Sequence, residues 1–152
     1  MYTIIGITGT NGAGKGTIVS RLIEHEGFAH YSMSGFIAEE VTRRGLPMNR
    51  DSLIAVANDL RATFGAAFIV ESLYRRAFAS EKDAVIESLR ALGEVRRIKE
   101  LGGFVIGVDA DQRLRYERVR ARGSAKDDVM YEKFVAQEDL ESQGGDPFKQ
   151  DL

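Results

Sequence analysis

The sequence predicts an α/β domain built around a short parallel β-sheet. Four short apolar runs alternate with segments whose apolar residues recur at helical spacing, which is the pattern of a parallel sheet with connecting helices. A glycine-rich turn follows the first run directly. The chain has 152 residues, of which 43% are hydrophobic, and this length and composition suit one globular core. We therefore expect a single domain over residues 1–152.

The first half of the chain contains two expected strands and four expected helices. Residues 2–8 form a β-branched run that ends at Gly9, and residues 28–31 form a second short run. Four apolar stripes mark the helices: Ile18, Val19, Leu22 and Ile23; Phe36, Ile37 and Val41; Leu53, Ile54, Val56, Ala57, Leu60 and Phe64; and Phe68, Ile69, Leu73, Ala77 and Phe78. Asp51 or Ser52 is expected to cap the third of these helices, and Gly65 to end it.

The second half contains two further strands and three further helices. The apolar run at 84–86 ends in Glu87, and the run at 104–108 ends in Asp109. The expected helices carry Val95, Ile98 and Leu101, then Leu114, Arg118 and Arg122, and finally about residues 129–142, with an irregular tail at 143–152. Ligands bind beyond the carboxyl ends of parallel strands, so Gly9, Glu87 and Asp109 should share one edge of the sheet.

The composition of the chain indicates which partners, metal centres and cellular compartment to expect. The 21 Lys and Arg against 23 Asp and Glu give a net charge of −2, which predicts neither a nucleic-acid nor a membrane partner. There is no cysteine, and the two histidines, His25 and His30, are too few for a histidine-based metal centre. The chain shows no apolar run of bilayer length and no signal-peptide pattern, so we expect a cytoplasmic protein.

The glycine-rich turn carries the strongest functional signal. It consists of Gly9, Thr10, Asn11, Gly12, Ala13, Gly14, Lys15, Gly16 and Thr17. A glycine, four residues and then Gly-Lys, between a strand and a helix, is the pattern of a phosphate-binding loop. Its backbone N–H groups and the positive end of the helix attract an anion, while Lys15 reaches the β- and γ-phosphates. A dinucleotide-binding motif counted from Gly12 would need glycine where Thr17 stands.

The placement of Gly16 after Lys15 adds a family resemblance. Gly-Lys-Gly-Thr resembles the loop of adenylate kinases and their relatives, the nucleoside monophosphate kinase group of P-loop proteins. Shorter segments are similar in the same order: Ser34-Gly35-Phe36-Ile37 to deoxynucleoside monophosphate kinases, Glu39-Glu40 with Arg43-Arg44-Gly45-Leu46 to dephospho-CoA-kinase-like proteins, and Arg115-Tyr116-Glu117-Arg118 to the helix before the lid. The resemblance implies a three-layer P-loop NTPase sandwich with helices on both faces, substrate-side helices at about 32–79 and a small lid at about 119–128.

The function that this resemblance implies is transfer of the γ-phosphate of ATP, with Mg²⁺, to a small acceptor. A nucleoside or deoxynucleoside monophosphate is the expected acceptor. Dephospho-CoA is an alternative, although its hydroxyl would need a general base and no carboxylate stands out for that role. A nucleotide-binding or regulatory module without transfer activity is a second alternative, and an ATPase switch is a third.

The chemistry of the residues and the family resemblance together suggest roles for individual residues. Lys15, Arg118 and Arg122 are expected to stabilise the moving phosphoryl group, although the two arginines, four apart, also fit a solvated helix face. Thr17 and Glu87 are expected to hold magnesium, with a solvated strand-end acid as the alternative for Glu87. The expected acceptor ligands are Ser34, Arg61 and Arg90. Asp109 and Asp111 are expected in turn and cap roles, and His30 in a structural one.

Two departures from the family pattern bear on these expectations. Adenylate kinases carry Asp and Arg for the acceptor phosphate where Gly35 and Ala38 stand here. Relatives also continue into a fifth strand, and no fifth β-run follows residue 142. An open sheet edge favours association, so we expect either a homodimer or limited stability. The identity of the acceptor, the oligomeric state and the pathway stay open.

Overall fold

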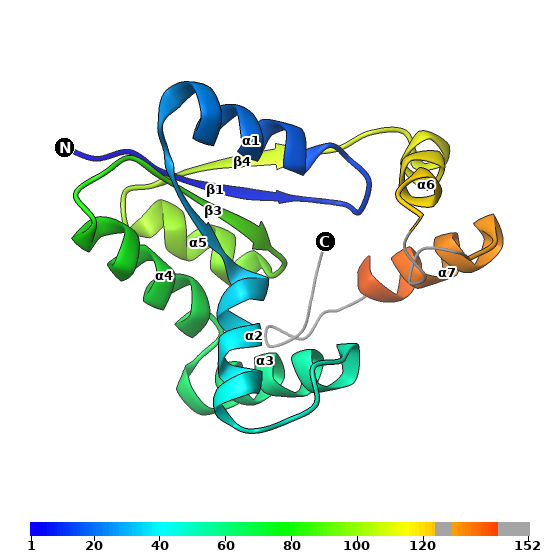
Figure 1. The fold of residues 1–152 in the computed structure, drawn as a ribbon, viewed down its shortest axis with the longest axis horizontal. Coiled ribbons are helices and arrows are strands. Elements are labelled where there is room, and N and C mark those ends of the chain that lie inside the picture. Colours follow the sequence, from blue (N-terminus) through cyan, green and yellow to red (C-terminus); the bar gives the residue numbers. More distant parts are fainter. Residues whose placement is uncertain (124–128, 143–152) are drawn as a thin grey trace.

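A four-stranded parallel sheet organises the part of the chain that the structure describes, residues 1–123 and 129–142 (Figure 1). In this computed structural model the strands are β1 (Ile4–Gly9), β2 (Ala29–Ser32), β3 (Ala84–Leu89) and β4 (Phe104–Val108). Their order across the sheet is β2-β3-β1-β4, with every neighbouring pair parallel. The carboxyl ends of all four strands therefore meet at one edge, as the sequence predicts.

Helices cover both faces of the sheet and extend beyond its carboxyl edge (Figure 1). They are α1 (Lys15–Glu26), α2 (Met33–Arg43), α3 (Arg50–Phe64), α4 (Phe68–Ala79), α5 (Leu92–Glu100), α6 (Gln112–Ala121) and α7 (Tyr131–Ser142). Helix α1 packs on one face, while α4 and α5 pack on the other. Helices α6 and α7 lie beyond the ends of β1 and β4, so they reach the same edge as the glycine-rich loop.

The alternation of side chains along the strands divides the core in two. Val85 joins Ile7 and Val19 in the smaller cluster under α1. Its neighbours Ala84 and Ile86 point the other way, into the larger cluster that α2, α3, α4 and α5 complete. Strand β3 is thus covered on both faces, which explains why its run of 84–86 is continuously apolar.

Several expected details differ from the structure. Asn49, rather than Asp51 or Ser52, caps α3, because its side chain accepts a hydrogen bond from the Ser52 N–H at 2.9 Å. Ile54 and Phe64 belong to the predicted apolar stripe of α3 but are 45% and 60% exposed. The helix buries a narrower stripe at Val56, Ala57 and Leu60. Phe78, on α4, is also exposed.

Half of one predicted segment and the whole of another fall outside the described residues. Residues 124–128 are the second half of the lid predicted at about 119–128, and residues 143–152 are the predicted irregular tail. Among the described helices, none by itself combines the length and apolar composition needed to span a bilayer; α3 and α4 meet the criterion only jointly, across an 86° bend.

Candidate active site

The glycine-rich loop lies between β1 and α1 and is packed tightly against two later elements. Gly9 has a φ of 143°, and a Cβ there would lie 2.0 Å from the carbonyl oxygen of Val108 at the end of β4. Gly12 has a φ of 78°, and its Cβ would lie 2.6 Å from the carbonyl oxygen of Arg115 on α6. Only glycine fits these backbone conformations and approaches. The loop sequence thus matches the space available to it.

The first turn of α1 offers its N-terminus to an anion. The helix begins at Lys15, and its cap, Gly14, has a φ of 105° and supplies no side-chain hydrogen bond. The N-terminal N–H groups of a helix and its dipole favour negative charge when no side chain caps them. The side chain of Thr17 is exposed in the same turn. This is the local arrangement that a phosphate-binding loop requires.

Lys15 lies at the centre of a basic cluster. Its Nζ donates hydrogen bonds to the carbonyl oxygens of Gly9 and Thr10, both at 2.7 Å. Burial lowers the pKa of Lys15 from its usual value of 10.5 to about 8, helped by the charges of Arg90, Arg122 and Arg115 and opposed by that of Glu87. The charge of Lys15 is therefore influenced by side chains from β3, from the turn after β3 and from the α6 region.

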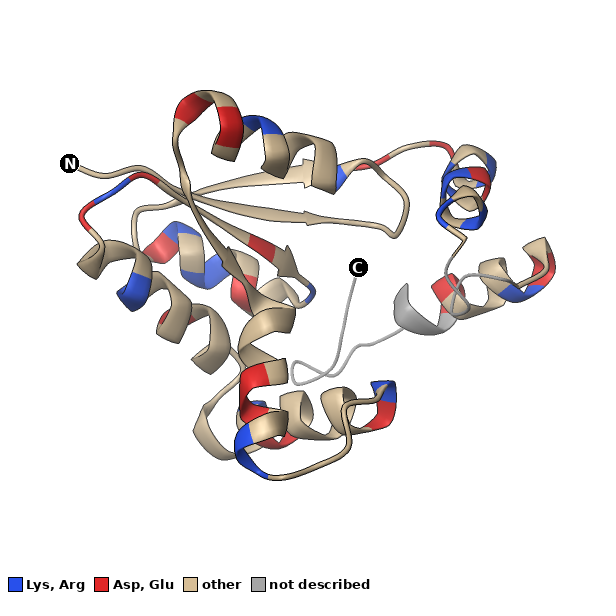
Figure 2. Cartoon of the chain, viewed as in Figure 1, with Lys and Arg blue, Asp and Glu red and all other residues tan. Residues whose placement is uncertain are grey.

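Helix α6 brings its arginines to the loop across more than 100 positions of sequence. Nη1 of Arg118 donates to the carbonyl oxygens of Gly12 and Ala13, at 3.2 and 3.4 Å. Nη1 of Arg122 donates to Oδ1 of Asn11 at 3.4 Å. Figure 2 shows Lys and Arg spread over α6 and at the start of α1. The predicted catalytic residues Lys15, Arg118 and Arg122 are thus brought together around the loop.

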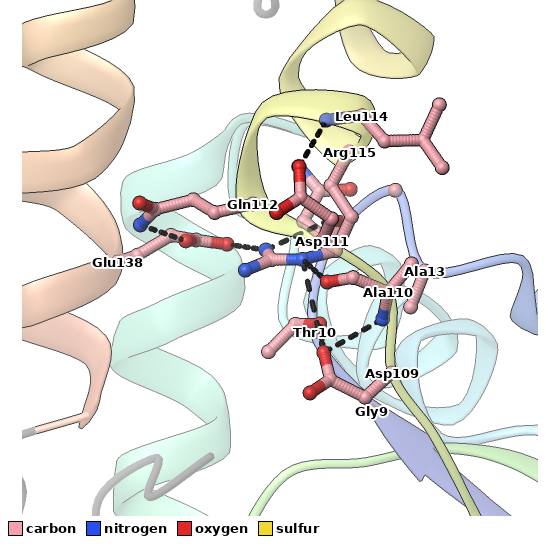
Figure 3. Close-up of polar contacts among 12 residues, drawn as sticks. Gly9, Thr10, Ala13, Asp109, Ala110, Asp111, Gln112, Leu114, Arg115 and Glu138 are labelled. Carbon is pink, nitrogen blue, oxygen red and sulfur yellow. Dashed lines mark hydrogen bonds and ion pairs between the residues drawn. The ribbon is translucent and has the colours of Figure 1, made fainter.

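Arg115 is a residue of this site that sequence reasoning missed (Figure 3). Its guanidinium is buried, with Nε donating to the Ala110 carbonyl at 2.8 Å and Nη1 donating to the Asn11 carbonyl at 3.4 Å. Nη1 also pairs with the carboxylate of Glu138 on α7. The spacing of 115, 118 and 122 places three arginines on one helix face, and this stripe was the available signal.

The two aspartates after β4 have the turn and cap roles expected of them. The Asp109 carboxylate accepts hydrogen bonds from the Ala110 N–H at 2.8 Å and the Thr10 hydroxyl at 3.1 Å. These contacts, the Ala110 one foremost, hold the pKa of Asp109 below its usual value. Asp111 caps α6 by accepting from the backbone N–H groups at positions 113 and 114. Asp109 thereby fastens the end of β4 to the phosphate-binding loop.

The residues predicted for magnesium fit an ion that arrives with a nucleotide. Mg²⁺ usually keeps several waters and is held by one or two side chains together with phosphate oxygens. Thr17 offers an exposed hydroxyl, and the partly exposed Glu87 carboxylate is close enough to Lys15 to raise its pKa. Glu87 also pairs with Nε2 of His30 at 3.0 Å. Within the described residues, no group of three or more His, Asp or Glu forms a separate metal site.

The three residues predicted for the acceptor have different surroundings. Ser34 is exposed in the first turn of α2, with its hydroxyl 3.0 Å from that of Ser32. Arg90 is partly exposed, near enough to Lys15 to lower its pKa. Arg61 is only 3% exposed, and its Nε and Nη2 donate to Oε1 of Glu94 at 3.2 and 2.8 Å. The structure thus places Ser34 and Arg90 at the surface and Arg61 in a buried ion pair.

Known proteins are similar to this chain in sequence and in fold. The sequence model of a family described as an AAA domain matches residues 5–141. A UPF0200 protein from Pyrobaculum aerophilum is 30% identical over 137 residues, which cover 89% of this chain and 75% of the relative. TT1252 from Thermus thermophilus has a similar crystal structure, with a TM-score of 0.62, 23% identity and coverage of 91% of this chain and 80% of that one.

A second solved structure shows the same fold at lower identity. A gluconokinase from Sinorhizobium meliloti 1021 matches with a TM-score of 0.56 and 16% identity, over 94% of this chain and 78% of that one. The predicted fold, a P-loop NTPase sandwich, is thereby confirmed. With its glycine-rich loop, parallel sheet and matched sequence, the chain belongs to the AAA domain family of P-loop proteins, together with the UPF0200 proteins.

Proposed function

We propose that this protein transfers the γ-phosphoryl group of ATP, in the presence of Mg²⁺, to a nucleoside or deoxynucleoside monophosphate. The observation that carries the proposal is the position of Lys15 inside a phosphate-binding loop and within the charge field of three arginines. Phosphoryl transfer depends mainly on positioning and on neutralising charge, and this cluster supplies both.

On the donor side, the loop binds the phosphates and α6 neutralises them. Lys15 exchanges its two carbonyl partners in the loop for phosphate oxygens, and the N-terminus of α1 faces the same anion. Arg118 and Arg122 already contact the loop, so little reorganisation is needed for them to meet developing charge. Thr17 and Glu87 would hold Mg²⁺, which supplies further neutralisation of the phosphates when bound.

On the acceptor side, Arg90 and Ser34 are the accessible candidates. The charge of Arg90 acts on Lys15 and lowers its pKa, and its planar fork can bind a phosphate through two hydrogen bonds. The phosphate of a monophosphate acceptor is already ionised, so the reaction needs no general base. In the described site the Asp109 carboxylate is held by a turn, and Glu87, the proposed Mg²⁺ ligand, also pairs with His30.

The test is ADP release from ATP and Mg²⁺, measured with each common nucleoside and deoxynucleoside monophosphate and with dephospho-CoA. We expect one acceptor to raise the rate, and Lys15→Ala to reduce that rate by at least about 100-fold because an interaction with the transferred charge is lost. Lys82→Ala, an exposed lysine just before β3, is the matched control and should keep full activity. If dephospho-CoA alone stimulates turnover, the acceptor is a hydroxyl rather than a phosphate.

A nucleotide-binding module without transfer activity is the second candidate. The specific observation in its favour is that Arg61, one of two arginines predicted for the acceptor, is committed to Glu94. Gly35 and Ala38 add to this, because neither can bind a phosphate through its side chain. This candidate predicts that wild type binds ATP, that Lys15→Ala does not, and that no acceptor changes the rate of ADP release. That combination would contradict the proposed kinase.

A further inference from the structure

A buried ion pair between Arg61 and Glu94 connects α3 to the first turn of α5, which follows the turn after β3. Glu94 is fully buried and Arg61 nearly so. Both hydrogen bonds from Arg61 go to one carboxylate oxygen of Glu94, Oε1. A buried charge is tolerated only when it is paired and hydrogen-bonded, and the two residues satisfy each other in this way.

The second oxygen of Glu94 holds the backbone of the turn. Oε2 accepts hydrogen bonds from the N–H groups of Arg90 at 2.8 Å and Ala91 at 3.0 Å. From the other side, the hydroxyl of Thr8 on β1 donates to the carbonyl oxygen of Leu89 at 3.0 Å. Three consecutive residues of the turn are therefore fixed by side chains from two other places in the fold.

The turn needs this support because its backbone is strained. Ser88 has a φ of 70°, a region that residues with a Cβ seldom adopt. The pairing of β1 with β3 shifts register between Gly6 and Thr8, opposite this point. Strained residues persist where surrounding contacts over-determine them, and they gather at functional sites. Here the residue carried by the turn is Arg90, two positions after Ser88.

We infer that Arg61 is a positioning residue, which acts through Glu94 to hold the 88–91 turn and so aims the Arg90 side chain at the acceptor phosphate. The inference rests on the proposed function for the identity of the ligand, but the mechanical link from Arg61 to Arg90 does not. The alternative role, direct binding of the acceptor by Arg61, requires this residue, which is 3% exposed, to leave Glu94. That would leave a fully buried carboxylate unpaired, which is costly.

Two variants separate positioning from direct binding. Glu94→Ala removes the hydrogen bonds to the turn. The double glutamine variant, Arg61→Gln with Glu94→Gln, carries no charge at either position. Its two side-chain amides can hydrogen-bond to each other, while the amide carbonyl introduced at position 94 still accepts hydrogen bonds from the turn. Arg96→Gln, at an exposed position on α5, controls for the loss of an arginine. The whole 152-residue chain is used throughout, and thermal unfolding verifies that each variant is folded.

The first readout is amide hydrogen exchange in the protein without ligand. We expect Glu94→Ala to speed exchange at Arg90 and Ala91 by about tenfold or more relative to β4 amides, because the hydrogen bonds that protect these two amides are lost. The double glutamine variant should restore protection. Unchanged exchange in Glu94→Ala would overturn the inference, and this holds whether or not the protein is a kinase.

The second readout is the steady-state kinetics with the acceptor found in the panel. Glu94→Ala should raise the acceptor KM about tenfold or more and leave the KM for ATP within about twofold, with the double variant restoring the acceptor KM. If the double variant restores amide protection but not the acceptor KM, Arg61 binds the acceptor itself. If no acceptor stimulates turnover, the proposed function fails while the exchange data still decide the link. Should Glu94→Ala not fold, Arg61→Gln alone replaces it: equal KM defects in Arg61→Gln and the double variant would overturn the inference.

Discussion

At the scale of single residues, the pKa of Lys15 depends on whether phosphates are bound in the glycine-rich loop. Burial and neighbouring arginines bring its pKa to about 8, so in the protein without ligand the charge is present at pH 7 and lost as the pH rises through 8. Bound phosphates would stabilise the charged form and raise the pKa again. Nucleotide binding is thereby linked to proton uptake above pH 8.

We predict that binding of ATP takes up protons at pH 9 but not at pH 6.5, and that ATP affinity falls as the pH rises above 8. Isothermal titration calorimetry in two buffers of different ionisation enthalpy measures the uptake directly. Lys15→Met cannot take up this proton, so its binding heat, if any remains, should not depend on the buffer. Equal heats for wild type in the two buffers at pH 9 would contradict the low pKa.

At the scale of elements, α6 presents two different basic faces. Arg118 contacts the backbone of the phosphate-binding loop, whereas Arg120 lies over the ring of Tyr116, 5.9 Å from its centroid. Residues two positions apart on an α-helix are separated by about 200° of rotation, so the side chains of Arg118 and Arg120 leave the helix on nearly opposite sides. The arginines that contact the phosphate-binding loop are those at positions 115, 118 and 122.

We predict that Arg118→Gln lowers kcat by about tenfold or more, since it removes a charge that stabilises the transferred phosphoryl group. Arg120→Gln makes the same change in net charge and should leave kcat unaltered. The comparison is made at saturating ATP and acceptor. Equal losses in the two variants would show that the overall charge of α6, rather than the contact with the loop, matters for turnover.

At the scale of the whole molecule, stability should depend on the two clusters that cover the sheet. Ile86 is fully buried in the larger cluster, while Ile54, on α3, is 45% exposed despite its place in an apolar stripe. We predict that Ile86→Ala lowers the free energy of unfolding by about 2–5 kcal/mol, through lost burial and a cavity. Ile54→Ala should cost less than about 1 kcal/mol.

Urea denaturation of the two isoleucine variants measures this difference. A large loss for Ile54→Ala would mean that its exposed side chain is covered in solution, as in a dimer. That result would support the association expected from the sequence. A small loss for Ile86→Ala would instead contradict its place in the core.

Much of the fold could be predicted because its signals are local. The order of strands and helices follows from apolar runs separated by glycines such as Gly27 and Gly65, each of which ends a helix with positive φ. Helix boundaries were less predictable, because Asn49 competes with Asp51 and Ser52 for the cap and hydrogen-bond geometry selects one. Exposure of Ile54 and Phe64 was not predictable, because the width of a buried stripe depends on what packs against it.

The candidate site, like the fold, has a part that the local sequence predicts and a part that it does not. The phosphate-binding loop is a contiguous motif, and its glycines are required by contacts that every such loop makes. The pairs Arg61–Glu94 and Arg115–Glu138 are 33 and 23 positions apart, and the Arg115–Asn11 contact spans 104. The chain has 15 arginines, and nothing in the local sequence marks Arg61 as the partner of Glu94. The arginine stripe on α6 likewise does not show that Arg115 pairs with Glu138. Arg61 was accordingly predicted as a ligand of the acceptor, whereas the structure shows it buried against Glu94.

The sequence by itself determined that this protein is a P-loop α/β domain, because backbone conformation and apolar periodicity are properties of neighbouring residues. Tertiary structure decided which charged side chains meet. Strand order β2-β3-β1-β4 brings the ends of β1, β3 and β4 together, and α6 then lies against the loop. The charge around Lys15 and the support of Arg90 arise there, since electrostatic and hydrogen-bond energies depend on distance in space and not on separation along the chain.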